Sequence, residues 1–199
     1  DNLADKAKKL GIPVWKFGGA KRRRIGHLLN GQAYGITQRM QRLKPLPKPA
    51  RSDAVLAAVF LENATVKAAA AEWAADQGFD NQALHAIAIA IELLLKSYLL
   101  NVATDDVWNR ANIGHDLAKA LHYSAQAGLV PPSRIEWIIS HLHPHFQRGG
   151  FQREPSRKWP PGFADDAGEV ARQLAQTVRL HQRHGHIDSA SSPEKTTPR

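Results

Sequence analysis

Residues 84–121 constrain the fold of this chain most strongly, because they form two patterned helical segments joined by a polar connector. In the first segment apolar residues recur every three or four positions, which is the spacing of one face of an α-helix. This apolar stripe consists of Leu84, Ile87, Ala88, Ile91, Leu94, Leu95 and Tyr98. Glu92 and Lys96 lie one turn apart in the order that favours a helical ion pair. We therefore predict that this helix faces a core.

Further segments after residue 52 also have the helical period, and none alternates as a convincing strand would. Helices are predicted over 53–77 and 115–127. Ser133 and Glu136 have the spacing of a capping box, so another helix is predicted to begin there and to end at Pro144. The predicted stripe of the first of these helices is Leu56, Val59, Phe60, Ala70, Trp73 and Ala74.

The segment over 145–163 is rich in glycine, proline and arginine and has no period, which predicts a loop at the rim of a site. A last helix follows and ends near His184. The fold class is therefore all-α, an up-and-down bundle of four to five helices with an extended basic N-terminal arm. We expect the arm and a proline-rich linker over 1–51, the bundle over 52–184 and a disordered tail over 185–199.

The positive charge of the chain is concentrated in the arm. Residues 1–51 hold 13 of the 27 Lys and Arg against two acidic residues, whereas residues 52–199 hold 14 against 16. The candidate nucleic-acid-binding cations are Lys21, Arg22, Arg23 and Arg24 of the arm and Arg148, Arg153, Arg157 and Lys158 of the predicted loop. Such cations neutralise phosphates, and aromatic residues among them stack on bases. The alternative is that the arm is a solvated leader that packs on the bundle or on a second subunit.

The core helix and the segment after it carry the pattern Ala-x-Glu-x-x-x-Lys followed, after a loop, by Gly-His-Asp-Leu. In this chain the pattern comprises Glu92, Lys96, His115 and Asp116. It resembles the HEPN superfamily, whose members are small helical bundles found in RNase toxins, antiphage systems and partners of nucleotidyltransferases. The resemblance implies a bundle that acts on RNA. Within it we expect His115 to be a cap or an interhelical hydrogen-bond partner.

HEPN RNases are recognised by an arginine followed, after four to six residues, by a histidine. The cation would stabilise a developing phosphorane and the imidazole would move the 2′-hydroxyl proton, without a metal. The pattern occurs at Arg110/His115, Arg134/His141 and Arg179/His184. Arg134 and His141 are two turns apart on one predicted helix, within about 20° of each other. They are the candidate catalytic residues, although the sequence leaves open whether the chain is an enzyme.

Histidine clusters over 141–145 and 181–186 suggest a metal site, but Pro144 disrupts the first and no carboxylate lies beside either. The chain has no cysteine and no glycine loop with phosphate-binding spacing. We therefore expect neither a metal nor a cofactor. The apolar run of the core helix is short and contains charges, and no signal peptide is evident. We thus expect a cytoplasmic protein without membrane contact.

Two functions fit these patterns. The first is an RNA-directed bundle that binds RNA or cleaves it as a metal-independent endoribonuclease of toxin or antiphage type. The second is a non-catalytic module that dimerises and docks a protein partner. The core helix carries Ile89, Leu93 and Leu100 outside its main stripe. Because this is more apolar area than one bundle face covers, we expect a homodimer.

Overall fold

The computed structural model describes residues 43–147 and 149–190. These residues form helices and connecting turns and contain no strand, which confirms the predicted all-α class. The chain divides after Pro45, and the unit that begins at Leu46 holds every described helix. The helices are α3 (Ala54–Asp76), α4 (Asp80–Val102), α5 (Asp106–Asn112), α6 (Leu117–Gln126), α7 (Ile135–Phe146), α8 (Gly150–Arg153) and α9 (Phe163–Ala190).

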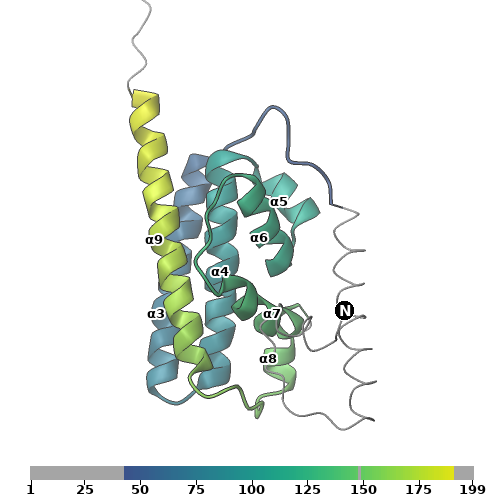
Figure 1. Cartoon of the computed structure of the whole chain (residues 1–199), viewed down its shortest axis with the longest axis vertical. Coiled ribbons are helices and arrows are strands. Elements are labelled where there is room, and N and C mark those ends of the chain that lie inside the picture. Colours follow the sequence, from purple (N-terminus) through teal and green to yellow (C-terminus); the bar gives the residue numbers. More distant parts are fainter. Residues whose placement is uncertain (1–42, 148, 191–199) are drawn as a thin grey trace, which may run out of the picture. The chain divides into compact units, whose positions relative to one another are not determined.

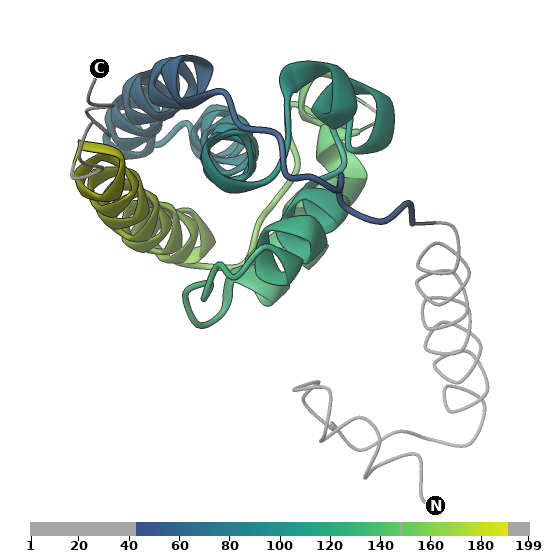
Figure 2. The ribbon, with the colours of Figure 1, turned by 90° about the horizontal axis from the view of Figure 1, so that it is seen from above.

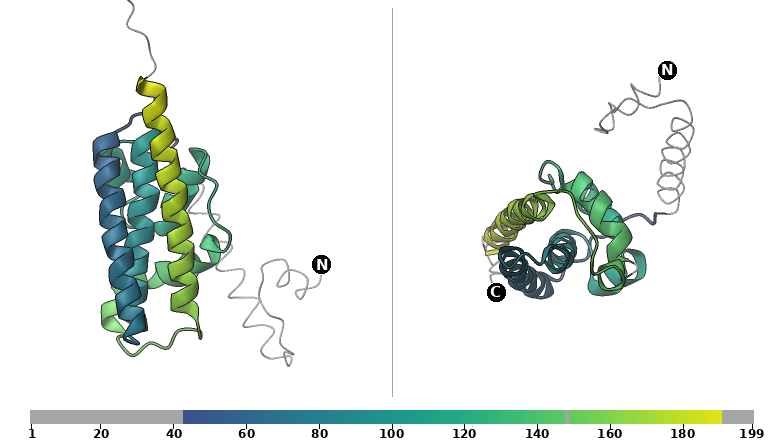
Figure 3. Two further views of the ribbon diagram at one scale, coloured as in Figure 1. Left: turned by 90° about the vertical axis from the view of Figure 1, so that its left-hand side faces the viewer. Right: turned by 90° about the horizontal axis from the view of Figure 1, so that it is seen from below.

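The long helices α3, α4 and α9 lie side by side (Figures 1 and 2). Helix α4 separates α3 and α9 from the shorter helices. A tight turn at Gly78, with a φ of 73°, joins α3 to α4 as an antiparallel pair. The helices α6 and α7 pack on the side of α4 that α3 and α9 leave open (Figure 3). The core helix therefore has neighbours on both sides, as a helix with apolar residues around most of its circumference requires.

The predicted apolar stripe of α4 is buried along its whole length, from Leu84 to Tyr98. The helical period of the sequence also predicts inward positions in α6 and α7, and all of these are buried: Leu117, Ala120, Leu121 and Ser124 in α6, and Ile135, Ile138, Ile139 and Leu142 in α7. The buried polar side chains of α4 have partners. The hydroxyl of Ser97 donates to the carbonyl of Ala57, with an O–O distance of 2.7 Å, and thereby ties α4 to α3.

Aspartates begin three of the helices. The carboxylates of Asp53, Asp105 and Asp116 accept hydrogen bonds from the backbone N–H groups of Leu56, Trp108 and Lys119, over 2.7 to 3.0 Å. Each bond satisfies an N–H group that has no partner within its own helix. The predicted start of the first helix near residue 53 is therefore confirmed.

The predicted bounds of α7 are wrong at both ends. The helix begins at Ile135, and the residue before it, Arg134, has a left-handed backbone with a φ of 71° and makes no capping bond with its side chain. The box of Ser133 and Glu136 is therefore not formed. The helix also continues through Pro144 to Phe146. A proline in a last turn removes only one backbone bond, and the N–H of Gln147 still donates to the carbonyl of His143.

Three segments differ from the sequence-based description. The polar connector contains α5, and the predicted loop contains the single turn α8. The last helix continues to Ala190, past its predicted end near His184. The unit that holds the helices begins at Leu46, and the backbone N–H of Arg51 donates to the carbonyl of Ala103.

The face of α3 that points inward differs from the predicted stripe. Its buried residues are Ala57, Ala64, Ala71 and Ala74. Of the predicted stripe only Ala74 is buried, whereas Val59 and Trp73 are exposed. The helix is apolar on nearly every side, so its sequence period does not identify the inner face. Side-chain size decides instead, because alanines allow a close approach of two helices.

The apolar residues of α4 that led us to expect a homodimer are covered by this chain itself. Leu100 is buried, and Ile89 and Leu93 are half-buried. That reason for a dimer is therefore wrong.

By length and composition both α3 and α4 could cross a membrane, but the buried core helix of a globular bundle has the same length and composition. The apolar stretch of α4 is 78% buried inside the bundle. The corresponding share for α3 is 17%.

We predict that Ala64→Leu destabilises the bundle by about 1–3 kcal/mol, because Ala64 is 1% exposed and added methyl groups would overpack the inner face of α3. Urea unfolding followed by circular dichroism measures the effect. The control Ala58→Leu makes the same change at an exposed position of the same helix and should shift stability by less than about 0.5 kcal/mol. Equal effects at both positions would contradict the packing described here.

Candidate nucleic-acid interface

Six rings form a continuous series between the first turns of α4 and helix α7. In order they are His85, Phe151, Trp159, Phe163, Trp137 and His141, and successive ring centroids lie 4.7 to 5.8 Å apart. We call this set the aromatic series. Phe151 and Phe163 are buried and anchor it, whereas Trp137 and Trp159 reach the surface. The series therefore presents two indole rings whose positions are held by packing.

An arginine lies over each of these indoles. The guanidinium carbon of Arg157 is 4.9 Å from the ring centre of Trp159, and that of Arg134 is 5.2 Å from Trp137. Cations at this distance are attracted by the electron-rich face of the ring. Arg157 also donates to Glu154 over 2.8 Å, in an exposed pair that contributes little to stability. This arrangement places positive charge directly beside exposed aromatic surface.

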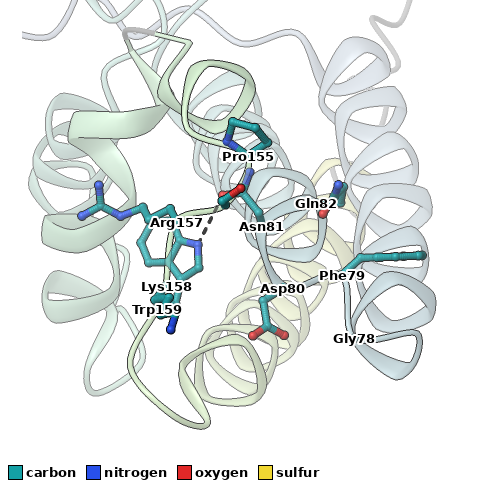
Figure 4. A pocket seen from close by; sticks show the side chains of 10 residues that line it. Gly78, Phe79, Asp80, Asn81, Gln82, Pro155, Arg157, Lys158 and Trp159 are labelled. Atoms are coloured by element: carbon teal, nitrogen blue, oxygen red, sulfur yellow. Dashed lines mark hydrogen bonds between the residues drawn. The ribbon is translucent and has the colours of Figure 1, made fainter.

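A groove of about 430 Å³ lies between the α3–α4 turn and the loop that carries Trp159 (Figure 4). Its lining residues are Gly78, Phe79, Asp80, Asn81, Gln82, Pro155, Ser156, Arg157, Lys158 and Trp159. Two of these residues are cations from the loop, and Asp80 supplies one carboxylate from the opposite wall. The groove therefore combines positive charge, a ring edge and neutral polar groups.

Asn81 holds the loop against α4. Its side-chain amide donates to the backbone carbonyl of Phe151 over 2.6 Å, and its oxygen accepts from the indole N–H of Trp159 over 3.3 Å (Figure 4). The residue is buried, so these bonds satisfy polar atoms that water does not reach. Sequence reasoning missed this role, because the two partners lie 70 and 78 positions away.

The predicted loop cations are partly assembled here. Arg153, Arg157 and Lys158 are exposed, and the last two line the groove. Arg148 and the arm cations Lys21, Arg22, Arg23 and Arg24 lie outside the described residues. The structure thus brings two of the eight predicted cations to one groove and adds the aromatic series, which the sequence did not indicate.

Arg134 and His141 both contact Trp137 but are not prepared equally for catalysis. Arg134 lies before α7, and its guanidinium donates twice to the carboxylate of Asp166, over 2.6 and 2.9 Å. That pair lowers the pKa of Asp166 and raises the pKa of Arg134. The Nδ1 atom of His141 lies 2.8 Å from the backbone carbonyl of Trp137. The imidazole therefore keeps Nε2 for chemistry, whereas the cation is already bound to a carboxylate.

Three of the four residues of the Glu–Lys and Gly-His-Asp-Leu pattern, Glu92, Lys96 and His115, form a second polar cluster. Buried Glu92 lies 2.5 Å from the Nζ atom of Lys96, and both of its oxygens lie 3.1 Å from Nδ1 of His115. Asp116 caps α6, and its carboxylate lies 3.5 Å from Nε2 of His143. His115 is therefore the interhelical partner and Asp116 the cap.

This cluster gives His115 an orientation suited to proton transfer. Its side chain is 79% exposed, while the carboxylate of Glu92 engages Nδ1 and leaves Nε2 unengaged by that contact. Arg110 precedes His115 in one of the three Arg–His patterns of the sequence. Its exposed side chain pairs with Asp106 over 2.7 Å. The structure thus offers two oriented imidazoles, His115 and His141, and the arginine that precedes each of them in the sequence is paired with an aspartate.

Among the described residues no three histidines or carboxylates lie close enough together to hold a metal ion. Comparison of the chain with family models, with curated proteins and with solved structures gives no match.

We predict that acid destabilises the bundle through His85. Burial, followed by the charge of Lys67, lowers the pKa of His85 below its ordinary value of 6.5. Below about pH 6.5, His85 therefore binds more protons in the unfolded chain than in the folded chain. The free energy of unfolding consequently falls as the pH decreases from about 6.5 towards 5. His85→Phe keeps a ring on Phe151 and removes the titration. Urea midpoints at pH 7.5 and 5.5 should differ less in this variant than in the parent, and an unchanged difference would exclude His85 as a source.

Proposed function

We propose that this chain is an RNA-binding helical bundle that captures single-stranded RNA at the groove and the exposed edge of the aromatic series. The observation that carries the proposal is the position of Arg157 over Trp159, with Lys158 beside them at the groove. Cations next to aromatic rings that reach the surface are the arrangement that proteins use to bind phosphates and stack unpaired bases together.

The chemistry of the groove favours single strands over a duplex. An A-form duplex hides its base faces, so proteins recognise it through phosphates and 2′-hydroxyls across a wide groove. Indole rings add nothing to that contact but stabilise a splayed base by about 1–3 kcal/mol. Gln82 and Ser156 in the groove offer hydrogen bonds to base edges or to a ribose hydroxyl.

The resemblance to HEPN bundles supports the same proposal, because the cluster around Glu92 assembles the residues that carry it. The basic arm supports it through composition alone, since 13 of its residues are Lys or Arg. Within this proposal the arm supplies non-specific attraction to phosphates, and the groove selects unpaired bases.

We predict that Trp159→Ala weakens binding of a fluorescent single-stranded RNA by about 5- to 100-fold, the loss of one base stack. Fluorescence anisotropy at fixed ionic strength measures it. Trp159→Phe should retain most of the affinity, because it keeps a ring while losing the bond to Asn81. Equal losses in both variants would mean that the bond, and not stacking, matters.

A matched pair of charge variants tests the same site without touching the ring. Arg157→Gln with Lys158→Gln should reduce affinity and lower the salt slope by about 2, one for each phosphate contact. Arg110→Gln removes a more exposed cation outside the groove and should change neither. If the loop variants bind like the parent, while deletion of residues 1–51 abolishes binding, the site lies in the arm and the groove proposal is wrong.

Cleavage by Arg134 and His141 stays a prediction. The ion pair between Arg134 and Asp166 opposes it, because the guanidinium is already bound to a carboxylate. If the purified protein cleaves RNA in EDTA, His141→Ala should reduce the rate by about 100-fold or more. Asp166→Asn should increase it, because the variant releases the guanidinium of Arg134 from its carboxylate. If instead activity survives His141→Ala and is lost in both His115→Ala and Glu92→Gln, proton transfer belongs to His115.

A further inference from the structure

The outer side of α3 carries a row of exposed residues with regular spacing. The row, called the outer row below, consists of Val55, Val59, Glu62, Val66, Ala69 and Trp73, separated by four, three, four, three and four positions. Val55 is 80% exposed, Val66 62% and Trp73 64%. Alternating steps of three and four are the spacing with which helices pack along a shared seam.

The opposite side of α3 already has its own seam. Ala57, Ala64 and Ala71 are buried there at intervals of seven residues. Few residues of this apolar helix are covered, however, and a helix that is apolar on all sides is normally buried on all sides. The outer row is therefore a second seam without a neighbour among the described residues.

We infer that a second copy of this chain packs on the outer row, with its α3 antiparallel to the first. A parallel pair would place Glu62 opposite Glu62 and Trp73 opposite Trp73. An antiparallel pair centred on residue 64 places Trp73 opposite Val55, Val59 opposite Ala69 and Glu62 opposite Val66. Large side chains then face small ones, and the two carboxylates are separated.

The dimensions of the face suit a dimer. At 1.5 Å per residue and a width of about 10 Å, α3 alone offers a strip of about 350 Å². The adjacent helix α9 runs alongside it and exposes Leu180, so the two helices together offer about 700 Å². A standard interface buries about 800 Å² on each partner, so a contact through α3 and α9 is of sufficient size.

The charges of α3 disfavour a membrane as the occupant. Its ionisable residues are Glu62, Lys67, Glu72 and Asp76, which sum to a net charge of −2. Helices that lie on membranes carry lysine and arginine along their polar side, and anionic lipid would repel this surface. A second copy has no such requirement, because the antiparallel arrangement places the one carboxylate of the outer row, Glu62, opposite the apolar Val66 of the partner subunit.

The dimer would connect the outer row to the groove. The ring of Trp73 lies 6.4 Å from that of Phe79, which lines the groove. In the antiparallel arrangement, Val55 of the partner subunit would pack beside this ring pair. The two grooves would then lie at opposite ends of the α3 pair, roughly 40 Å apart along the helix axes.

The test is the oligomeric state of the full chain, measured by light scattering after size exclusion at about 50 µM. Val66→Glu should convert a dimer to a monomer while leaving the circular dichroism unchanged, because it places two carboxylates beside Glu62. Val130→Glu is the matched control, since Val130 is 77% exposed outside α3. A parent protein that is monomeric, or a dimer that Val66→Glu leaves intact, overturns the inference.

Because the chain has no cysteine, introduced cysteines report the direction of the helices. A mixture of Val59→Cys and Ala69→Cys chains should yield a disulfide-linked heterodimer under mild oxidation, whereas each variant alone should not, since like positions would lie about 15 Å apart. Crosslinking of Val59→Cys with itself indicates a parallel pair and overturns the proposed direction. A monomer that co-sediments with phosphatidylserine vesicles assigns the row to lipid and overturns the dimer.

Discussion

The burial of α4 on every side is the constraint on which the rest of the structure depends. The helix is apolar around most of its circumference, so α3 and α9 must cover one side and α6 and α7 the other. Polar side chains inside this helix are tolerated only with partners. Ser97 accordingly bonds the backbone of α3 and accepts from Gln182 of α9, and Glu92 is paired with Lys96. These pairs fix the rotation of α4 relative to its neighbours.

The candidate interface depends on the same helix. Asn81 and His85, one turn apart at the start of α4, reach across to Phe151 through a hydrogen bond and a stacked ring. Helix α8 is therefore held against the core helix, and the indole N–H of Trp159, which donates to Asn81, ties the loop after α8 to the same helix. The position of Trp159 at the groove follows from packing on Phe151 and Phe163, both of which are buried. A site on a loop thus acquires the rigidity of the bundle.

Sequence patterns predicted those helices whose two faces differ in polarity. The stripes of α4, α6 and α7 were correct, because only one arrangement buries their apolar residues. The same reasoning failed for α3, which is apolar on nearly every side. Close packing of its alanines decides which side of this helix faces inward. It could not find the aromatic series, whose contacts join residues as far apart as His85 and Phe151. It also placed Arg134 within a helix, because a left-handed residue before a helix leaves no periodic signal.

In the proposed function, the distribution of charge is the reason why stacking would carry RNA recognition within the bundle. Residues 52–199 have 14 cationic and 16 acidic side chains, so this part of the chain exerts no long-range attraction on RNA. Arg157 and Lys158 act over a short distance only, since exposed charges are screened beyond about 8 Å at physiological salt. Contact with the groove must therefore come from an encounter that another segment begins, and residues 1–51, with a net charge of +11 from 13 cations and two acids, have the charge for it. In the proposed function, attraction and selection would be separated along the chain, so the outer row of α3 would need no cations of its own and could pack on a second copy.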